Sequence, residues 1–314
     1  MIEIKEKHFF YCYTPFHYLL SLEIIRIEKL ESASLFICND ITIPNVDLPP
    51  SIEVISSNWA LFKIILRLKN KCVFYCANYK KLKSRVLAKL VSANTMISLD
   101  DGLGTRWGRG YFYENDKSHY KRLILKYLFM KPYLEFWKDS ISLHYSCYPV
   151  GVTCSNKKTK FISPDFSNRI ERSRNHNLEG VVILGSPLVE DGILKQSEYS
   201  QILSQVVFKS LSSKIYYYAH PRERQKNDIL KLLGGDIEWI KNDGAVELFL
   251  FRSSPNIKIV GFYSSALINL KAMGYQNAYN FSTPILDLAI GDIDKLHQFF
   301  LAYNIKQYSD SNEN

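Results

Sequence analysis

Short apolar runs of strand composition alternate with amphipathic helical stretches along this 314-residue chain, and the alternation restricts its possible folds more than any other feature. Strand, helix and strand in succession form a parallel sheet, because parallel strands need a crossover connection and the helix supplies it. The predicted strands are 8–13, 35–38, 52–55, 72–76, 95–99 and 140–145, and then 181–184, 214–219, 237–240, 257–260 and 278–281. We therefore expect an α/β protein with two Rossmann-like, doubly wound domains.

A polar segment without periodicity, Ser163 to Asn177, separates the two alternating halves, and we place the interdomain linker there. The expected units are an N-terminal acceptor-side domain over 1–165, a C-terminal nucleotide-binding domain over 178–290 and a tail over 291–314. Neither half contains a G-x-G-x-x-G or a G-x-x-x-x-G-K-[ST] sequence. This argues against a dinucleotide oxidoreductase and against a P-loop enzyme.

Targeting and redox signals point to the cytoplasm. No apolar run approaches the roughly 20 residues of a membrane-spanning helix, and the charged stretch Met1 to Phe10 is unlike a signal peptide. The cysteines lie mostly in apolar strand-like runs, so we expect reduced core thiols. Cys72 and Cys76 share a strand about 13 Å apart, which is too far for a common zinc ion.

The formal net charge of +9 has no accompanying nucleic-acid-binding motif. Basic residues with interleaved aromatics, as in Lys126 to Trp137, fit an anionic membrane surface or an acidic substrate at least as well. Solvated helix faces of a basic protein explain any single cluster equally simply. We therefore expect a cytoplasmic protein that can also associate with the inner face of the membrane.

A His-Pro pair follows the predicted strand 214–219 and is the strongest candidate for a ligand site. Pro221 fixes its own φ and holds His220 out of helical geometry, so the imidazole sits on a stiff turn at the carboxyl end of a strand. Ligands bind at that end of open α/β sheets. Arg222 follows directly, and a hydrogen-bonding ring beside a fixed cation suits an anion such as phosphate.

Several short motifs together resemble the bacterial sialyltransferases of glycosyltransferase family 52, which build lipooligosaccharide and capsule. The acid-acid-Gly and His-Pro motifs are shared with bacterial polysialyltransferases. The resemblance spans about Phe9 to Phe281, and its residues are Thr14-Pro15 with His17 and Leu19-Leu20, Asp100-Asp101-Gly102, Gly185-Ser186-Pro187 with Glu190-Asp191, His220-Pro221, and Ser264-Ser265.

The resemblance implies a GT-B fold, with the two domains facing a central cleft. It also implies CMP-sialic acid as the donor, inversion at the anomeric carbon and no obligatory metal or other cofactor. The expected acceptor is a terminal galactose of a lipooligosaccharide or capsular glycan, with α-2,3 linkage favoured. We expect no nucleic acid as partner, and we consider a homodimer.

Transfer of a sugar from CMP with inversion needs a carboxylate base and donors that stabilise the departing phosphate. We assign the phosphate to His220, together with the hydroxyls and amides of Ser264 and Ser265 at a helix start. Gly185, Ser186 and Pro187 would let the backbone approach the cytidine closely. Pro221 and Arg222 complete the donor loop, and Glu238, which we place at a strand end, would accept from the ribose hydroxyls.

Two carboxylates are candidates for the base. Asp101 follows a strand of the first half, and Asp191 lies at the corresponding edge of the second half. We rank them nearly equal, and whichever is not the base would cap a turn beside glycine. The sequence Asp292-Ile293-Asp294 resembles a metal-binding D-x-D, but it follows the last predicted strand and reads as surface.

Two other functions remain open from the sequence. One is a different CMP- or CDP-dependent transferase, for example of glycerol phosphate or another acidic sugar. The other is a basic, non-enzymatic module that binds nucleic acid or glycan without CMP.

Overall fold

A computed structural model of the chain describes residues 7–38, 48–67, 72–79, 82–91, 93–100, 140–148, 158–162, 179–210, 214–223, 237–240, 246–251, 256–290 and 293–308. The chain divides into two compact units, Met1–Ile170 and Glu171–Asn314, and each is described by itself. The segments expected as helices at 120–130 and 224–233, and the linker expected at 163–177, lie outside the described residues, as does Asp101.

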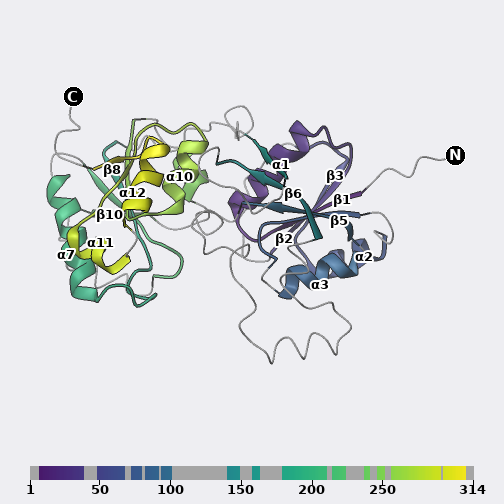
Figure 1. Cartoon of the computed structure of the whole chain (residues 1–314), viewed down its shortest axis with the longest axis horizontal. Helices are drawn as coiled ribbons and strands as arrows, with labels where there is room; N and C mark the ends of the chain where they lie inside the picture. Colours follow the sequence, from purple (N-terminus) through teal and green to yellow (C-terminus); the bar gives the residue numbers. More distant parts are fainter. Residues whose placement is uncertain are drawn as a thin grey trace. The chain divides into compact units, whose positions relative to one another are not determined.

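The first unit is built on a seven-stranded sheet in the order β3-β2-β1-β4-β5-β6-β7, in which every pairing is parallel. Its elements are β1 (Lys7–Cys12), α1 (Pro15–Ile27), β2 (Ala33–Ile37), β3 (Ile52–Ile55), α2 (Asn58–Arg67), β4 (Cys72–Cys76), α3 (Leu82–Leu90), β5 (Ala93–Leu99), β6 (Ile141–Ser146) and β7 (Lys158–Phe161). The helix α1 lies on one face of this sheet, and α2 and α3 lie on the other (Figure 1). The strand order reverses between β1 and β4, as in a doubly wound fold.

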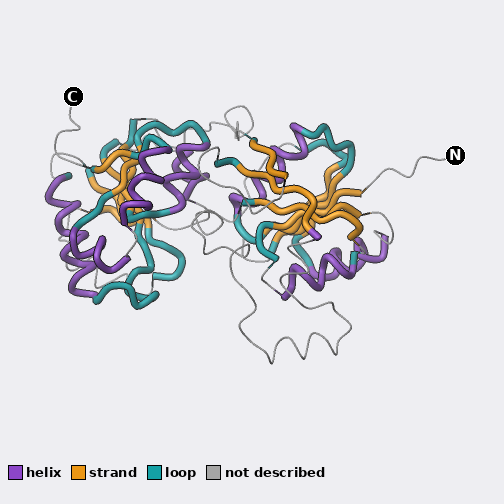
Figure 2. The backbone as a smooth tube through the Cα atoms, in the orientation of Figure 1, coloured by secondary structure: helices purple, strands orange, loops and turns teal. Residues whose placement is uncertain are grey.

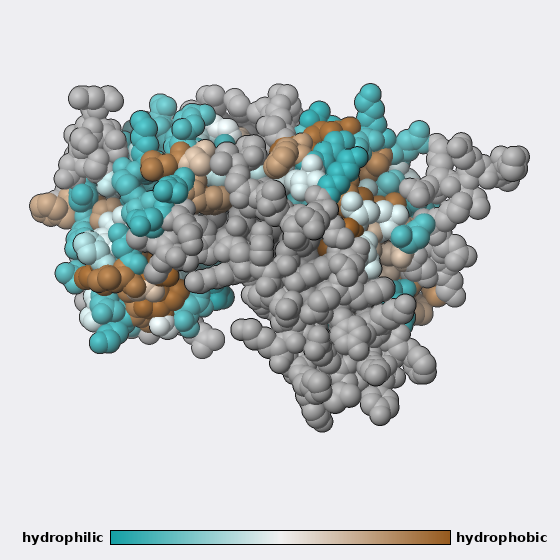
Figure 3. Space-filling model, viewed as in Figure 1, coloured by the Kyte–Doolittle hydropathy of each residue, from teal (hydrophilic) through white to brown (hydrophobic). Residues whose placement is uncertain are grey.

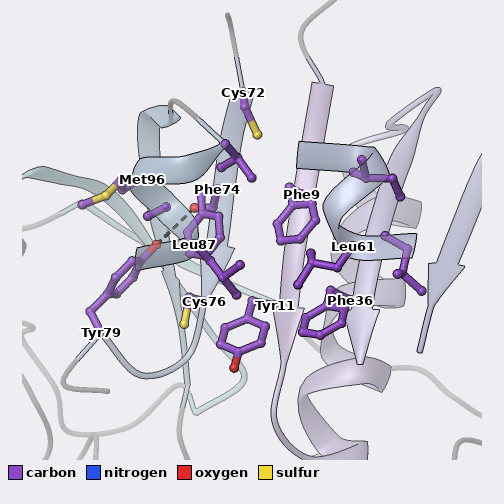
Figure 4. Packing of buried hydrophobic residues seen from close by; sticks show 14 of the residues in the cluster. Phe9, Tyr11, Phe36, Leu61, Cys72, Phe74, Cys76, Tyr79, Leu87 and Met96 are labelled. Atoms are coloured by element: carbon purple, nitrogen blue, oxygen red, sulfur yellow. Dashed lines mark hydrogen bonds between the residues drawn. The ribbon is translucent and has the colours of Figure 1, made fainter. Parts of the chain in front are cut away.

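Buried aromatic and aliphatic side chains fill the space between the sheet and helices α2 and α3. Phe9, Phe36 and Phe74 project from three neighbouring strands, and Leu61 of α2 packs into the same cluster (Figure 4). Tyr79 is fully buried there, with its hydroxyl donating to the carbonyl oxygens of Phe74 and Ile97. The near-continuous burial of β1 and β4 explains why these strands read as apolar runs rather than alternating ones.

The start of α1 has the predicted cap. The Thr14 side chain accepts a hydrogen bond from the His17 N–H at 3.2 Å, and Pro15 occupies the first helical position. The strand β7 was not predicted, because its residues Lys158 to Phe161 read as a basic surface cluster. It forms the edge of the sheet, where three of its four side chains are exposed.

The second unit repeats the same topology in a six-stranded parallel sheet of order β10-β9-β8-β11-β12-β13. Its elements are β8 (Val181–Leu184), α7 (Gln196–Lys209), β9 (Ile215–Tyr218), β10 (Ile237–Ile240), α9 (Val246–Phe251), β11 (Lys258–Gly261), α10 (Ser265–Ala272), β12 (Ala278–Asn280), α11 (Pro284–Ile290), α12 (Ile293–Ala302) and β13 (Lys306–Gln307). The alternation of helices and strands is visible in Figure 2. Two Rossmann-like domains are therefore confirmed.

The assignment of residues 291–314 to a tail was wrong for the described part of that segment. Residues 293–308 form α12 and β13, and β13 extends the second sheet by pairing with β12. Phe300 and Ile305 are each 1% exposed, so the segment contributes to the core. The two-residue strand is too short to show a period in the sequence, which is why it was missed.

The cysteines within the described residues, Cys12, Cys38, Cys72, Cys76 and Cys147, are all free thiols, as predicted. Burial raises the pKa of Cys12 and of Cys72 to about 12, so neither is a thiolate at neutral pH. None of the described helices is long and apolar enough to cross a membrane. On the face shown in Figure 3, hydrophobic residues lie among hydrophilic ones on both units.

Candidate active site

Three adjacent strands of the second sheet deliver the predicted donor residues at their carboxyl ends. In sheet order these strands are β9, β8 and β11, and the strand order reverses between β8 and β11. Gly185 follows β8, His220 follows β9, and Ser264 follows β11. Because parallel strands end at the same edge of a sheet, these loops share the crevice where doubly wound sheets bind nucleotides.

The His-Pro turn fixes the tautomer of His220. The backbone N–H of Arg222 donates to His220 Nδ1 at 3.1 Å, so Nδ1 must be unprotonated. A neutral imidazole then has its proton on Nε2, the ring atom on the other side from this bond. Glu223 holds the backbone of this turn, because its Oε2 accepts from the His220 N–H at 2.5 Å. The turn therefore presents one oriented N–H donor.

Burial lowers the pKa of His220 below its ordinary value of 6.5, and the Arg222 cation lowers it further, while Asp191 and Glu190 oppose both effects. A depressed pKa means that this group stabilises the fold above pH 6.5, and that this contribution is lost as the pH falls through the folded-state pKa. At neutral pH the ring is uncharged, and it acts as a hydrogen-bond donor rather than as a cation.

We expect NMR titration of the His220 ring to give a pKa below 6.5 in the wild-type protein. Arg222→Gln should raise this value, because the neighbouring cation is removed, but burial should keep it below 6.5. Asp191→Asn should lower it, because an opposing charge is lost. The resonance is assigned by its disappearance in His220→Gln, and a wild-type pKa above 6.5 would contradict the described turn.

Asp191 and Arg222, predicted as a base candidate and as a phosphate contact, are paired with each other. The guanidinium donates from Nη1 to Asp191 Oδ1 at 2.5 Å and from Nη2 to Oδ2 at 3.0 Å. The pair is partly exposed, with 60% of the Arg222 side chain and 35% of the Asp191 side chain accessible. A solvated pair of this kind adds little stability, so an incoming anion can compete for the guanidinium.

Glu223 joins the loops that follow β8 and β9, and it was not predicted from the sequence as a site residue. Tyr217 Oη donates to Glu223 Oε1 at 2.7 Å, and Tyr199 Oη donates to the same oxygen at 3.2 Å. Tyr199 Oη also accepts from the Ser186 N–H at 2.9 Å. One partly buried carboxylate thus connects the loop after β8 to the His220 turn after β9. The one sequence feature that pointed to Glu223 was its position directly after His220-Pro221-Arg222.

The same carboxylate gives Gly185 a structural role. A Cβ atom built at Gly185 would overlap Glu223 Oε2 and approach the Tyr217 hydroxyl to 2.7 Å. The space of its missing Cβ accommodates Glu223, and the close approach of a cytidine to this backbone stays a prediction. Ser186 is tied to Tyr199 through its N–H, and Pro187 accepts from the Asp191 N–H at 2.8 Å. The loop is therefore built around protein contacts.

Burial raises the pKa of Glu223, although hydrogen bonds from Tyr217, the His220 N–H and Tyr199 oppose the shift. We expect Glu223→Gln to cost about 1 to 3 kcal/mol of unfolding free energy, because an amide cannot accept on both sides and one buried donor is left unpaired. Urea denaturation measures this. Glu190→Gln is the control, because Glu190 is an exposed glutamate near the same loops. Equal stability of the two variants would show that the Glu223 network is not needed.

Ser264 and Ser265 lie at the start of α10, as predicted. Ser264 is the N-cap, and its side chain accepts from the Ala266 N–H at 3.3 Å. The preceding Tyr263 has a positive φ of 51°, and its N–H donates to Asn280 Oδ1 at 2.7 Å. Asn280 is fully buried, and its Nδ2 finds no hydrogen-bond partner within the described parts of the chain. A strained backbone held by a buried amide therefore fixes this helix start.

The structure does not bring Glu238 to the site. We predicted it at the end of a strand, but it is the second residue of β10 and aligns with Tyr216 of β9. It forms a 2.7 Å ion pair with Lys214, which precedes β9 and so marks the amino-terminal edge of the sheet. Both side chains are more than half exposed. The predicted strand 237–240 is correct, and Glu238 is its second residue rather than its last, so the assignment of Glu238 to the strand end was wrong.

In the first unit, the acid-acid-Gly motif begins with a buried carboxylate. Asp100 follows β5, and its Oδ2 accepts from the Cys147 N–H and from Ser146 Oγ, both at 2.8 Å. Its Oδ1 lies 3.0 Å from His144 Nε2, and the other ring nitrogen of His144 lies 2.7 Å from Ser98 Oγ. Asp100 is therefore occupied by the ends of β5 and β6. The base candidate Asp101 is the next residue and lies outside the described residues.

No metal-binding group of three or more His, Cys, Asp or Glu side chains occurs among the described residues. Of the D-x-D sequence, Asp294 belongs to the first turn of α12 and is exposed. Asp292 lies outside the described residues.

Comparison with known proteins gives a family and a fold. The model of glycosyltransferase family 52 matches residues 55–279. No curated protein sequence matches the chain. A sialyltransferase structure from Photobacterium damsela is similar with a TM-score of 0.51 at 12% identity, covering 98% of this chain and 82% of that one. The S. aureus MnaA structure with UDP is similar with a TM-score of 0.50 at 10% identity, covering 88% and 78%. The shared fold is GT-B.

Proposed function

Because the chain belongs to glycosyltransferase family 52, we propose that it is an inverting sialyltransferase that uses CMP-sialic acid as donor. The proposed acceptor is a terminal galactose of a bacterial lipooligosaccharide or capsular glycan, with an α-2,3 linkage. Membership of a glycosyltransferase family sets aside the non-enzymatic binding module that the sequence left open. The observation that carries the proposal is the oriented His220 turn at the nucleotide end of the second sheet.

The reaction needs two actions from the protein. The acceptor hydroxyl attacks the anomeric carbon of the sialic acid while its proton passes to a carboxylate, and the bond from that carbon to the CMP phosphate oxygen breaks. The leaving phosphate gains negative charge in the transition state. Asp101 or Asp191 would take the proton, and CMP leaves with the electron pair of the broken bond.

We assign stabilisation of the leaving phosphate to His220 and to the start of α10. The neutral ring offers Nε2–H as a donor that costs no reorganisation, because Nδ1 is already bonded to the Arg222 N–H. The N-terminal amides of α10 after Ser264 supply further donors and a favourable dipole end. Arg222 can exchange Asp191 for phosphate, since its pair with Asp191 is partly exposed. Together these groups replace the charge that a metal ion would provide.

A direct assay tests the proposal. The purified protein is incubated with CMP-sialic acid and a panel of galactose-terminated glycans, and products are detected by mass spectrometry. We expect a sialylated product and equal activity in EDTA. If transfer occurred only from another CMP- or CDP-linked donor, the transferred group in the proposal would be the group on that donor instead of sialic acid. Loss of activity in EDTA with recovery on adding Mg²⁺ or Mn²⁺ would contradict the metal-free mechanism.

A further inference from the structure

The helix α2 carries apolar side chains on both of its faces, although only one face is covered. Leu61 and Ile64 are buried against the first sheet, as expected for a crossover helix. On the opposite face, Trp59 is 66% exposed, and Phe62 and Leu66 are each 51% exposed. These three residues follow the i, i+3, i+7 spacing that lines one side of a helix. We call them the outer stripe of α2.

The two aromatic rings of the outer stripe support each other at the surface. The ring planes of Trp59 and Phe62 are stacked at 17° with centroids 5.9 Å apart. The ammonium group of Lys63 lies 5.6 Å from the Trp59 ring centroid, which is within the range of a cation–π contact. The stripe is thus an ordered apolar patch bordered directly by a positive charge.

The surroundings of the stripe are basic. Lys63 and Arg67 are exposed on α2, and the helix has no acidic residue. Lys7 Nζ donates to the Arg67 carbonyl oxygen at 2.8 Å, which brings a third cation to the same helix end. Apolar and aromatic side chains beside Lys and Arg form the pattern of helices that lie in the interface of an anionic bilayer.

We propose that the outer stripe of α2 docks this protein on an anionic lipid surface, with Trp59, Phe62 and Leu66 entering the headgroup region. Lys63, Arg67 and Lys7 then lie against the lipid phosphates. The charge complementarity selects a bilayer over a neutral protein partner, because a short stripe of three apolar side chains needs the added electrostatic attraction. This inference goes beyond the proposed donor and acceptor and does not depend on either.

The segment Lys126 to Trp137 was predicted from its sequence to suit an anionic membrane surface. It lies outside the described residues. The proposed docking surface is on α2, Asn58–Arg67, whose sequence NWALFKIILR alone resembles an ordinary core helix. The exposure of Trp59 and Phe62 distinguishes a membrane-docking helix from an ordinary core helix.

Vesicle sedimentation with the full chain tests the proposal. Wild-type protein should bind vesicles that contain about one-third phosphatidylglycerol and should bind pure phosphatidylcholine vesicles weakly. Trp59→Ser with Phe62→Ser should reduce binding to the anionic vesicles at least about tenfold. Lys63→Gln and Arg67→Gln should each reduce it about fivefold and reduce its sensitivity to salt. Phe208→Ser is the matched control, because Phe208 is 75% exposed on α7.

Two readouts keep the test decisive. Circular dichroism must show the same melting temperature for the variants, and transfer to a soluble galactoside must be unchanged, so that a failure of the proposed reaction is seen separately. Light scattering after size exclusion reports the oligomeric state. Absence of wild-type binding, or equal binding by Trp59→Ser with Phe62→Ser, would overturn the proposal. So would a change in that variant's dimerisation without a change in vesicle binding.

Discussion

Replacing His220 with alanine should reduce turnover by an amount that corresponds to about 2 to 4 kcal/mol of transition-state stabilisation. The reason is geometric. The Arg222 N–H occupies Nδ1, so the ring offers one donor, at Nε2, and alanine removes it without disturbing the backbone bond from the His220 N–H to Glu223. Ground-state affinity for CMP should fall less than turnover does, because charge on the leaving phosphate grows only as the bond breaks.

Steady-state transfer kinetics beside calorimetric titration with CMP measure the two quantities. His220→Gln is the informative control, because its amide retains an N–H donor on a side chain of similar reach. We expect it to recover part of the loss. A His220→Ala protein that folds and turns over at the wild-type rate would remove this residue from the mechanism.

The sequence was sufficient for features that depend on neighbouring residues. The cap at Thr14 and the strands at 52–55, 72–76, 181–184 and 237–240 match because apolar runs and turn residues act locally. The stiff turn at His220 also depends on its near neighbours Pro221, Arg222 and Glu223. In each case, the interactions that decide the structure lie within a few residues of the pattern that predicts it.

The missed features depend on contacts between segments that are distant in the chain. Glu223 gains its role from Tyr199 and Gly185, which lie 24 and 38 residues earlier and face it only after the sheet has formed. The short strand β13 exists because it pairs with β12, since two residues carry no periodicity of their own. Sequence patterns do not record such pairings, so the site was predicted as a set of loops without the network that joins them.

The position of the base gives the largest expected effect. Removing a general base from an intact site should lower turnover by roughly 10²–10⁴-fold, with CMP affinity little changed, because the proton moves only in the transition state. We therefore expect at least one of Asp101→Asn and Asp191→Asn to abolish transfer and still bind CMP. Asparagine keeps the size of the side chain but cannot take the proton. Near-wild-type transfer by both variants would refute the pair.

The pairing of Asp191 with Arg222 makes a sharper test possible. Both oxygens of Asp191 accept from the guanidinium, so departure of Arg222 would free both of them for the acceptor hydroxyl. The donor phosphate offers Arg222 a stronger partner, and its arrival would release the carboxylate. In this case, Arg222→Gln should weaken CMP binding, while Asp191→Asn should lower turnover alone.

If Asp191 serves only to hold Arg222, the two substitutions remove the same interaction. Asp191→Asn and Arg222→Gln should then each weaken CMP binding by a similar factor, and the double variant should be no worse than either single one. Any loss of turnover from the missing phosphate contact would be equal in all three proteins, and Asp101→Asn would carry the larger loss. A double-mutant cycle on CMP affinity and turnover therefore assigns the base, because the two roles predict opposite patterns of additivity.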